Sequence, residues 1–364
     1  MQQIQEIPIS FKGSKLKPPI FLTGCGRSGT SMLQRTIASH KNIFSFRSET
    51  HLFGKHHHIP HLKDTNLPDL LNNARYTFAQ EILYKEFEIN EDTDSLILAV
   101  LSVMLNTIEC TPEIIMQKNY SGELLEILEE LKRFAVIDIK DKYNAFDLCA
   151  SYLTLKAHKK RWADKSAINM FNMKKILKLY PDAKFIEIYR DPRGVFYSWT
   201  RCPFPFFRLT TPLGCIQRWL KAAHLGDKLQ EQYPNQYYRV KYEALIQNPA
   251  DELERICNFI EEEFDPNMLN FKTYNSSFKE YNGKEGFDNK RTDHWKAGLS
   301  ISELIFIDSI TKKYREQLGY PDVAPKVNLM NVFPLILYLT QLCIKVRVSP
   351  LSLLEKIKNA NARA

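Results

Sequence analysis

Short apolar segments alternate with longer amphipathic ones along much of the chain. Brief apolar runs bounded by turn residues predict strands at Ile20 to Thr23, 183–189 and 237–242. Helical periodicity, with Asp191 followed by Pro192 as one clear start signal, predicts helices over about 30–40, 170–179, 191–199 and 249–262. This alternation favours an α/β fold in which helices flank a parallel sheet.

The stretch of about 62–160 differs, because its pattern is mainly helical. Helical runs cover 67–87, 95–105, 122–134 and 145–162, without a fixed repeat or a Ser/Gly-rich linker. We therefore interpret this stretch as an insertion within a single domain, 1–330.

The remaining segment, 331–364, contains about 13 nearly continuous apolar residues and then basic ones. At about 1.5 Å per residue, this apolar run is too short to span a bilayer core of about 30 Å. We expect a C-terminal helical tail that packs on the domain or on a second copy, with peripheral membrane contact as the alternative.

Composition limits the class of protein without choosing its function. The 364 residues are 44% hydrophobic and 25% charged, which is typical of a globular chain with a large core. A net charge of +8 suits nucleic acid, an anionic membrane or a phosphate-bearing small molecule. Seven scattered cysteines without a C-x-x-C pair, and no recognisable signal peptide, favour reduced thiols and a cytoplasmic protein.

Candidate chemistry begins at the loop Gly24 to Ser31, which follows a predicted strand and opens a predicted helix. Backbone N–H groups in such a turn, together with the positive end of the helix, can cradle a phosphate. A nucleotide triphosphatase loop would need a lysine where Thr30 stands. An ordinary glycine-rich turn is the plain structural alternative.

The glycines at 24, 26 and 29 also fit a dinucleotide fingerprint, with Glu49 at the distance of a ribose-binding acid. An NAD(P)-binding Rossmann oxidoreductase is therefore one alternative. Against it, the segment 42–49, NIFSFRSE, is not the continuous apolar second strand of that fold. A non-catalytic anion- or nucleotide-binding protein is the other alternative.

A second anion-binding segment lies at FIEIYRDPRGVFYSW. Arg190 follows the predicted strand, and Ser198 comes eight residues later, which is about two helical turns and roughly the same face. Both side chains can then converge on one anion.

Together these segments resemble sulfotransferases that use 3′-phosphoadenosine 5′-phosphosulfate (PAPS), especially the branch of tyrosylprotein, bacterial and carbohydrate-modifying enzymes. The resemblance covers about 18–300. It implies a P-loop-like core and transfer of a sulfuryl group from PAPS to an acceptor hydroxyl or amine. It also implies that PAPS is bound by Arg27, Ser28, Gly29, Thr30, Ser31, Arg190, Ser198, Tyr242 and either Lys290 or Arg291.

The same resemblance implies catalytic roles. In FRSETHLF, Glu49 matches the glutamate that deprotonates the acceptor, as a poorly nucleophilic alcohol requires. In WADKSAI, Lys165 matches a lysine at the sulfuryl group, although Ala167 replaces the usual proline. Arg27 would neutralise developing charge. His51 and His58 are reserve candidates for the base.

No metal is implied, because the consecutive histidines at 56–58 do not share a face and no carboxylate partner for a phosphate-bound cation is evident. The cofactor accounts for part of the basic excess, so we expect no nucleic-acid partner. The acceptor is not identified. Its expected walls are 62–160, 201–212 and the basic run 158–162, HKKRW.

Overall fold

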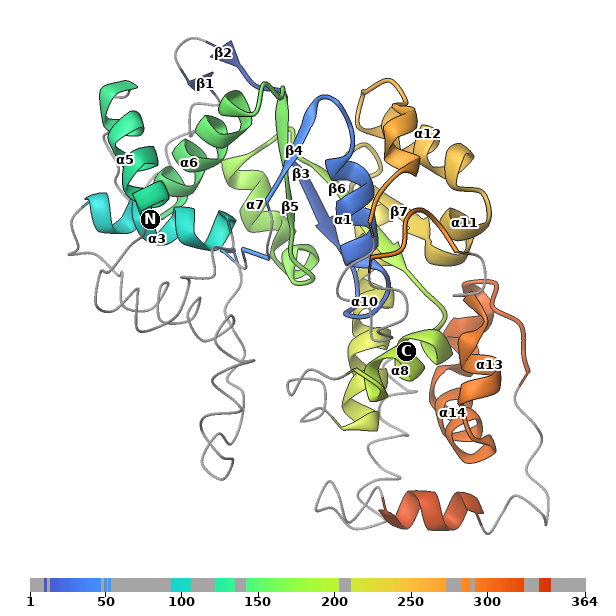
Figure 1. The fold of residues 1–364 in the computed structure, drawn as a ribbon. Coiled ribbons are helices and arrows are strands. Elements are labelled where there is room, and N and C mark those ends of the chain that lie inside the picture. The colour runs from blue at the N-terminus through green and yellow to red at the C-terminus, as the bar shows by residue number, and fades with distance from the viewer. Residues whose placement is uncertain are drawn as a thin grey trace.

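A parallel sheet forms the centre of the protein (Figure 1). The computed structural model describes residues 10–11, 14–46, 49–50, 52–53, 93–105, 122–134, 142–202, 211–272, 283–288, 292–323 and 334–341. Within these residues the strand order is β4-β5-β3-β6-β7, and every neighbouring pair is parallel. The strands are β3 Ile20–Thr23, β4 Ile43–Ser45, β5 Arg161–Lys165, β6 Lys184–Tyr189 and β7 Tyr237–Lys241. A separate antiparallel pair joins β1 Ser10–Phe11 to β2 Ser14–Lys15.

Helices cover both faces of the sheet. On one face lie α1 Thr30–Ala38, α11 Tyr242–Gln247 and α12 Pro249–Phe259. On the other lie α6 Lys142–Lys156, α7 Met173–Leu179 and α10 Pro212–Gln232. The remaining helices are α3 Thr93–Leu105, α5 Gly122–Phe134, α8 Pro192–Thr200, α13 His294–Gly298, α14 Ile301–Gln317, a helix at 334–341, and the short 3₁₀ turns η2 Asn169–Asn172 and η3 Pro266–Leu269.

Alternate strand positions supply the two apolar layers. Ile20 and Leu22 of β3 enter the cluster under α1, whereas Phe21 between them enters the cluster under α6 and α7. Phe21 stacks on Phe185 of the neighbouring β6, with ring centroids 5.1 Å apart. Successive strand residues point to opposite faces, so a strand buried on both sides is apolar throughout.

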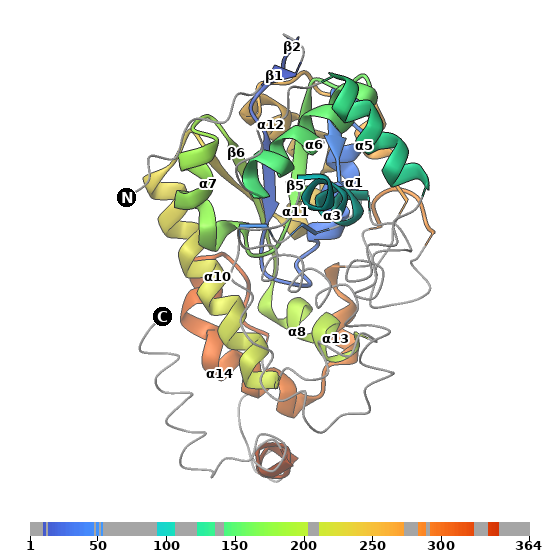
Figure 2. The same ribbon diagram turned by 90° about the vertical axis from the view of Figure 1, so that its left-hand side faces the viewer.

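The predicted strands are confirmed, and so are the predicted helices within the described residues, except for the end of the one predicted over 145–162. The predicted start at Asp191 is also confirmed, because its carboxylate accepts a hydrogen bond of 2.9 Å from the backbone N–H of Arg193. α3, α5 and α6 lie together on one side of the sheet and account for the described part of the helical stretch (Figures 1 and 2). The predicted helix 67–87 lies outside the described residues.

Two strands of the central sheet were not predicted from the sequence pattern. The segment 42–49 contains the edge strand β4, and the helix expected over 145–162 ends at Lys156, after which β5 begins at Arg161. β5 carries two cations and a carboxylate in five residues, yet all five are buried. Charged residues at fully buried positions hide such a strand from any search for apolar runs.

Two residues of the basic run 158–162, which was expected to form an acceptor wall, lie in the fold instead. Arg161 begins β5 at the amino end of the sheet, where its guanidinium donates to the carbonyls of Pro18 (2.9 Å) and Ile260 (2.5 Å). Trp162 lies in the core among Phe21, Phe46 and other aromatic rings. Both side chains therefore stabilise the fold.

Strand order also contradicts the dinucleotide-binding alternative. In a Rossmann fold the second strand lies beside the first, giving the order 3-2-1-4-5-6. Here β5 separates β4 from β3, so the second strand of the sheet lies at its edge. The glycine fingerprint is thus present on a different topology.

The described part of the C-terminal tail is the helix 334–341, and it packs on the domain. Tyr338 lies against Phe306 of α14, with ring centroids 5.6 Å apart, while Ile336 and Leu337 are about half exposed. None of the described helices combines the length and apolar character that crossing a bilayer would need. The remainder of 331–364 lies outside the described residues.

Reduced thiols were expected from the scattered cysteines. Cys25, Cys149, Cys202, Cys215 and Cys257, which are the cysteines within the described residues, are buried and form no disulfide. The described residues contain no cluster of His, Cys, Asp and Glu side chains that could hold a metal ion.

Asp147 of α6 provides a test of pH-dependent stability. Burial raises the pKa of its carboxyl to about 7, although the Tyr180 hydroxyl donates to it at 3.3 Å. An unfolded aspartate titrates near pH 3.9, so this group contributes stability below about pH 4 that is lost as the pH rises to 7. The substitution Asp147→Asn should therefore raise the unfolding free energy by up to about 4 kcal/mol at pH 8, and by less at pH 5. Urea unfolding at both pH values measures it, and equal effects at both would contradict the assignment.

Candidate active site

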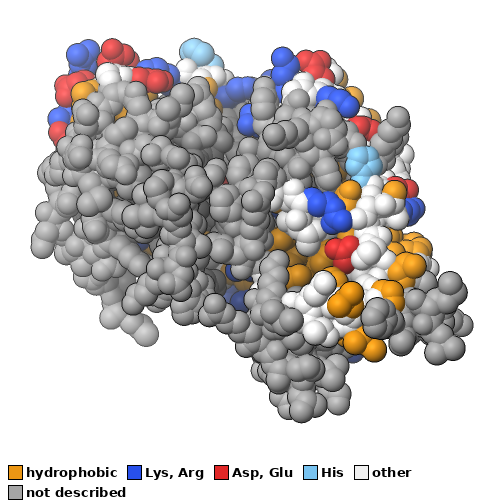
Figure 3. Space-filling model, turned by 60° about the horizontal axis from the view of Figure 1, so that its bottom comes forward, with side chains coloured by type: hydrophobic (Ala, Val, Ile, Leu, Met, Phe, Trp, Pro, Cys, Tyr) orange, Lys and Arg blue, Asp and Glu red, His pale blue; other side chains and the backbone are white. Residues whose placement is uncertain are grey.

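The predicted site residues gather at the carboxyl ends of the central strands. The Gly24 to Ser31 loop follows β3, Lys165 ends β5, and Arg190 follows β6. Tyr242 follows β7 directly. Because the strands are parallel, their carboxyl ends meet at one edge, where ligands of such sheets bind. Figure 3 views this end, and Lys and Arg side chains are visible in a recess near its centre.

Two glycines allow the loop to lie close to its neighbours. Gly24 has φ +144°, and a Cβ there would lie 2.4 Å from the carbonyl oxygen of Ile188. Gly29 has φ +103°, and its Cβ would lie 2.6 Å from the ring of Tyr242. These positive φ angles and close approaches restrict both positions to glycine. Arg27, between them, also has a positive φ of 70°, a conformation that is uncommon away from functional turns.

The loop ends at the amino terminus of α1 with Gly29 as its N-cap. No side chain caps this end, and the first N–H groups of a helix have no partner within it. The hydroxyl of Ser28 is buried and has no hydrogen-bond partner among the described residues. Thr30 and Ser31 supply two further hydroxyls at the same helix end. This combination of donors suits an anion with several oxygens.

Arg27 lies close to both predicted residues of the second segment, Arg190 and Ser198. The Nε of Arg27 donates to the hydroxyl of Ser198 at 3.3 Å, and a guanidinium nitrogen of Arg190 reaches the carbonyl of Arg27 at 3.5 Å. Burial lowers the pKa of Arg27, and the nearby Arg190 lowers it further, whereas Cys202 and Glu49 raise it. Two guanidinium groups therefore share a largely buried space, which an anion would stabilise.

Arg190 is held by its surroundings. Its guanidinium lies over the ring of Tyr242, 4.2 Å from the centroid, and its carbonyl accepts from the indole N–H of Trp219 at 2.8 Å. Glu243, which follows Tyr242 in the first turn of α11, accepts from the backbone N–H of Asp191 and from the hydroxyl of Tyr320. Burial raises the pKa of Glu243, while the charge of Arg190 opposes that rise. The strand ends thus orient the arginine.

The two predicted catalytic residues contact each other. The ammonium of Lys165 lies 2.5 Å from a carboxylate oxygen of Glu49. The side chain of Lys165 is 6% exposed and that of Glu49 is 29% exposed, so the pair is partly shielded from water while the carboxylate remains accessible. Lys290, Arg291, His51 and His58 lie outside the described residues, and their predicted roles stay predictions.

The family model described as the Sulfotransferase family matches residues 18–266, which is more than half of the chain. The chain belongs to this family. Its boundaries include both anion-binding segments and the Glu49–Lys165 pair. The predicted family is therefore confirmed, and so is the α/β fold with a P-loop-like core.

Individual relatives of this sulfotransferase-family chain agree with that result. A Caenorhabditis elegans protein named "Putative protein-tyrosine sulfotransferase" is 34% identical over 96 residues, which is 26% of this chain and 37% of the relative. Its Caenorhabditis briggsae counterpart is 31% identical over 96 residues, 26% of this chain and 34% of the relative. The matches thus span about a third of the length of each curated relative.

Among solved structures, the sulfotransferase domain of the olefin synthase of Synechococcus PCC 7002 has a TM-score of 0.53. The two are 19% identical, and the match covers 87% of this chain and 99% of that domain. At this identity the likeness establishes the fold.

Sequence reasoning missed the buried residues that support this sulfotransferase site. Asp164 of β5 accepts hydrogen bonds from Thr50, Ser166 and Asn169, and none of these four was singled out. The only signal in the sequence is position, since Thr50 follows Glu49 and Asp164 precedes Lys165. Glu243 was also missed, although it follows the predicted Tyr242.

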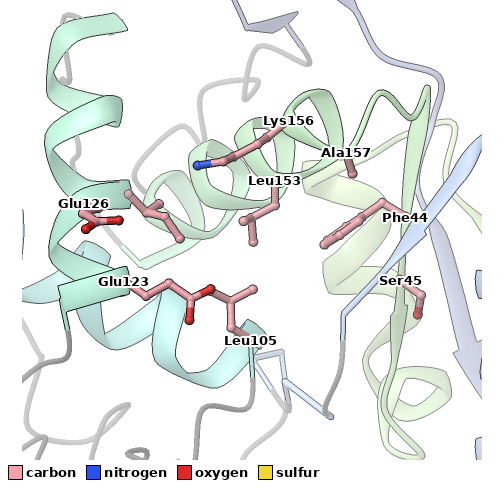
Figure 4. Close-up of a pocket in the computed structure, with 9 residues that line it drawn as sticks. Phe44, Ser45, Leu105, Glu123, Glu126, Leu153, Lys156 and Ala157 are labelled. Atoms are coloured by element: carbon pink, nitrogen blue, oxygen red, sulfur yellow. The ribbon is translucent and has the colours of Figure 1, made fainter.

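A separate cavity of about 280 Å³ lies between β4 and the helices α3, α5 and α6 (Figure 4). Phe44 and Leu153 provide apolar walls, and Glu123, Glu126 and Lys156 are among its charged lining residues. None of its lining residues is a predicted PAPS or catalytic residue. This cavity is therefore distinct from the site at the carboxyl edge.

The loop geometry predicts that Gly29→Ala disturbs this site. A left-handed backbone costs a non-glycine residue roughly 1–2 kcal/mol, and here the new methyl group would also displace the ring of Tyr242. Gly283→Ala is the matched control, because Gly283 has φ +86° but open space around its Cβ position. Chemical denaturation should show a larger loss of stability for Gly29→Ala. Equal losses would mean that the contact with Tyr242 is unimportant.

Proposed function

We propose that this protein transfers the sulfuryl group of PAPS to an acceptor hydroxyl or amine. One observation carries the proposal: the loop with Arg27, the Arg190–Ser198 segment and the Glu49–Lys165 pair meet at one edge of the sheet. Membership of the Sulfotransferase family supports the reaction class. A non-catalytic anion binder would have no need of a carboxylate beside its cations.

The residues present fit a nucleotide that carries phosphates at the 3′ and 5′ positions of its ribose. At the 5′ side, the buried Ser28 hydroxyl and the amino end of α1 offer donors. For the 3′-phosphate, we propose Arg190 and Ser198, with Tyr242 keeping the guanidinium of Arg190 in place. Thr30 and Ser31 would add hydroxyl donors, and Lys290 or Arg291 a further cation.

Bound PAPS would supply an activated sulfuryl group whose leaving group is a phosphate. Around it, this chain provides charge neutralisation through the buried Lys165 and the partly buried Arg27, whose charges are less screened by water than those of exposed groups. Glu49 accepts the proton of the acceptor, so that the attacking oxygen or nitrogen becomes a better nucleophile. The Lys165 ammonium, 2.5 Å from a carboxylate oxygen of Glu49, would also hold the proposed base in place.

The acceptor is proposed only as a chemical class. The names of the Caenorhabditis relatives mention protein tyrosine, so a tyrosine-containing peptide belongs in any panel of acceptors. Simple phenols, alkyl alcohols, amines and sugars should be tested beside it, because the matches span about a third of each relative.

Nucleotide selectivity tests the proposal directly. A thermal-shift panel of adenosine 3′,5′-bisphosphate, ATP and NAD should show stabilisation chiefly by the bisphosphate. Arg190→Gln should weaken bisphosphate binding by roughly 10-fold to 100-fold, because it removes a charged, preoriented donor. Arg255→Gln is the matched control, since Arg255 is an exposed arginine paired with Glu252 on α12. Preferential stabilisation by NAD would overturn the proposal, and so would an unaffected Arg190→Gln variant.

The role of Glu49 has its own test. Glu49→Gln should lower kcat by roughly 100-fold or more, with the affinity for adenosine 3′,5′-bisphosphate nearly unchanged, because the base acts on the acceptor. Turnover is measured with PAPS and the best acceptor of the panel, and binding by calorimetry. Glu123→Gln serves as the control, since this exposed glutamate lines the separate cavity. Full turnover by the Glu49 variant would refute its assignment as the base.

A further inference from the structure

We propose that Asp164 and Thr50 are positioning residues that hold Lys165 and Glu49 together, an inference that rests on the proposed function. Neither residue belongs to the predicted site, and each lies next to one that does. The hydroxyl of Thr50 donates to a carboxylate oxygen of Asp164 at 2.9 Å. This buried hydrogen bond sets the geometry of the ion pair beside it.

The ion pair and the hydrogen bond are formed by neighbouring residues on each of two chain segments. Glu49 and Thr50 lie on the segment that follows β4, while Asp164 and Lys165 end β5. Near this point the segments run side by side, because the N–H of Phe46 donates to the carbonyl of Ala163. One residue of each segment joins the ion pair, and its neighbour joins the buried hydrogen bond. Two adjacent links restrain relative rotation of the segments, which the ion pair alone would allow.

Asp164 connects several chain segments through hydrogen bonds to its carboxylate. Its side chain is fully buried, and its second carboxylate oxygen accepts from the amide of Asn169 at 2.8 Å and from the hydroxyl of Ser166 at 3.5 Å. Ser166 and Asn169 follow Lys165 along the chain, so one carboxylate connects the segments on both sides of the lysine. A buried carboxylate is costly without donors, and hence strongly favours the conformation that supplies them.

Thr50 is buried like Asp164, with 1% of its surface exposed. Its neighbour Glu49 is 29% exposed in its side chain, as a group that meets an acceptor must be. Thr50 therefore acts through Glu49 and Lys165. Its loss should loosen the position of the Lys165 ammonium, which we propose faces the sulfuryl group.

The experiment compares two nucleotides, because only PAPS carries the sulfuryl group. Thr50→Val removes the hydroxyl and keeps the shape. It should weaken PAPS binding about 10-fold in calorimetry while leaving adenosine 3′,5′-bisphosphate binding unchanged. Thr50→Ser keeps the donor and should restore PAPS affinity. Asp164→Ala should have the same selective effect, and Thr154→Val, which removes another buried hydroxyl within α6, should change neither affinity.

A double-substitution cycle separates positioning from a general structural role. In a Lys165→Ala background, Thr50→Val should cause no further loss of PAPS affinity, because the group that it positions is gone. Equal weakening of both nucleotides by Thr50→Val, or additive losses in the cycle, would overturn the inference and leave the proposed function intact. Unaltered PAPS binding by Thr50→Val would also overturn it. Failure of the unmodified protein to bind either nucleotide would instead overturn the proposed function, and this inference with it.

Discussion

The pairing of β3 with a parallel strand on each side is the constraint on which the site depends. β5 and β6 both hydrogen-bond to β3 in the same direction, so the three strands deliver their carboxyl ends to one place. The anion-binding loop and Arg190 directly follow β3 and β6, and Lys165 is the last residue of β5. Residues that are more than 130 positions apart in the sequence thereby meet without long flexible connections.

At the carboxyl edge of the sheet, three cations lie near a single carboxylate. Arg27 and Arg190 share a partly buried space, and a third cation, Lys165, faces the carboxylate of Glu49. Burying like charges together is unfavourable unless an anion joins them, so the arrangement favours a multiply charged ligand over a neutral one. The apolar layers beneath contribute indirectly, because they fix the strands that carry these groups.

The cations at the site differ from those that serve the fold. Arg161 is as deeply buried as any of them, yet its guanidinium is used by the carbonyls of Pro18 and Ile260 at the opposite end of the sheet. Arg193 is likewise occupied by Asp191 and by the carbonyl of Pro321. Burial and charge alone therefore do not identify a functional arginine. What distinguishes Arg27 and Arg190 is that their neighbours are each other and a loop rich in donors.

Local patterns in the sequence were sufficient to predict β3, β6, β7 and the helices α1, α7, α8 and α12, because apolar periodicity and an Asp-Pro start depend only on nearby residues. They also identified the glycine loop and the Arg190–Ser198 pair. They were insufficient to predict β5, because the burial of its Arg161, Asp164 and Lys165 depends on partners from distant segments. By itself the sequence determined which local elements form and which chemical groups are available. Only the tertiary structure decided that β5 lies between β3 and β4, and that Thr50 bonds to Asp164 beside the Glu49–Lys165 pair. Strand order and contacts between distant segments arise from packing, which no local pattern encodes.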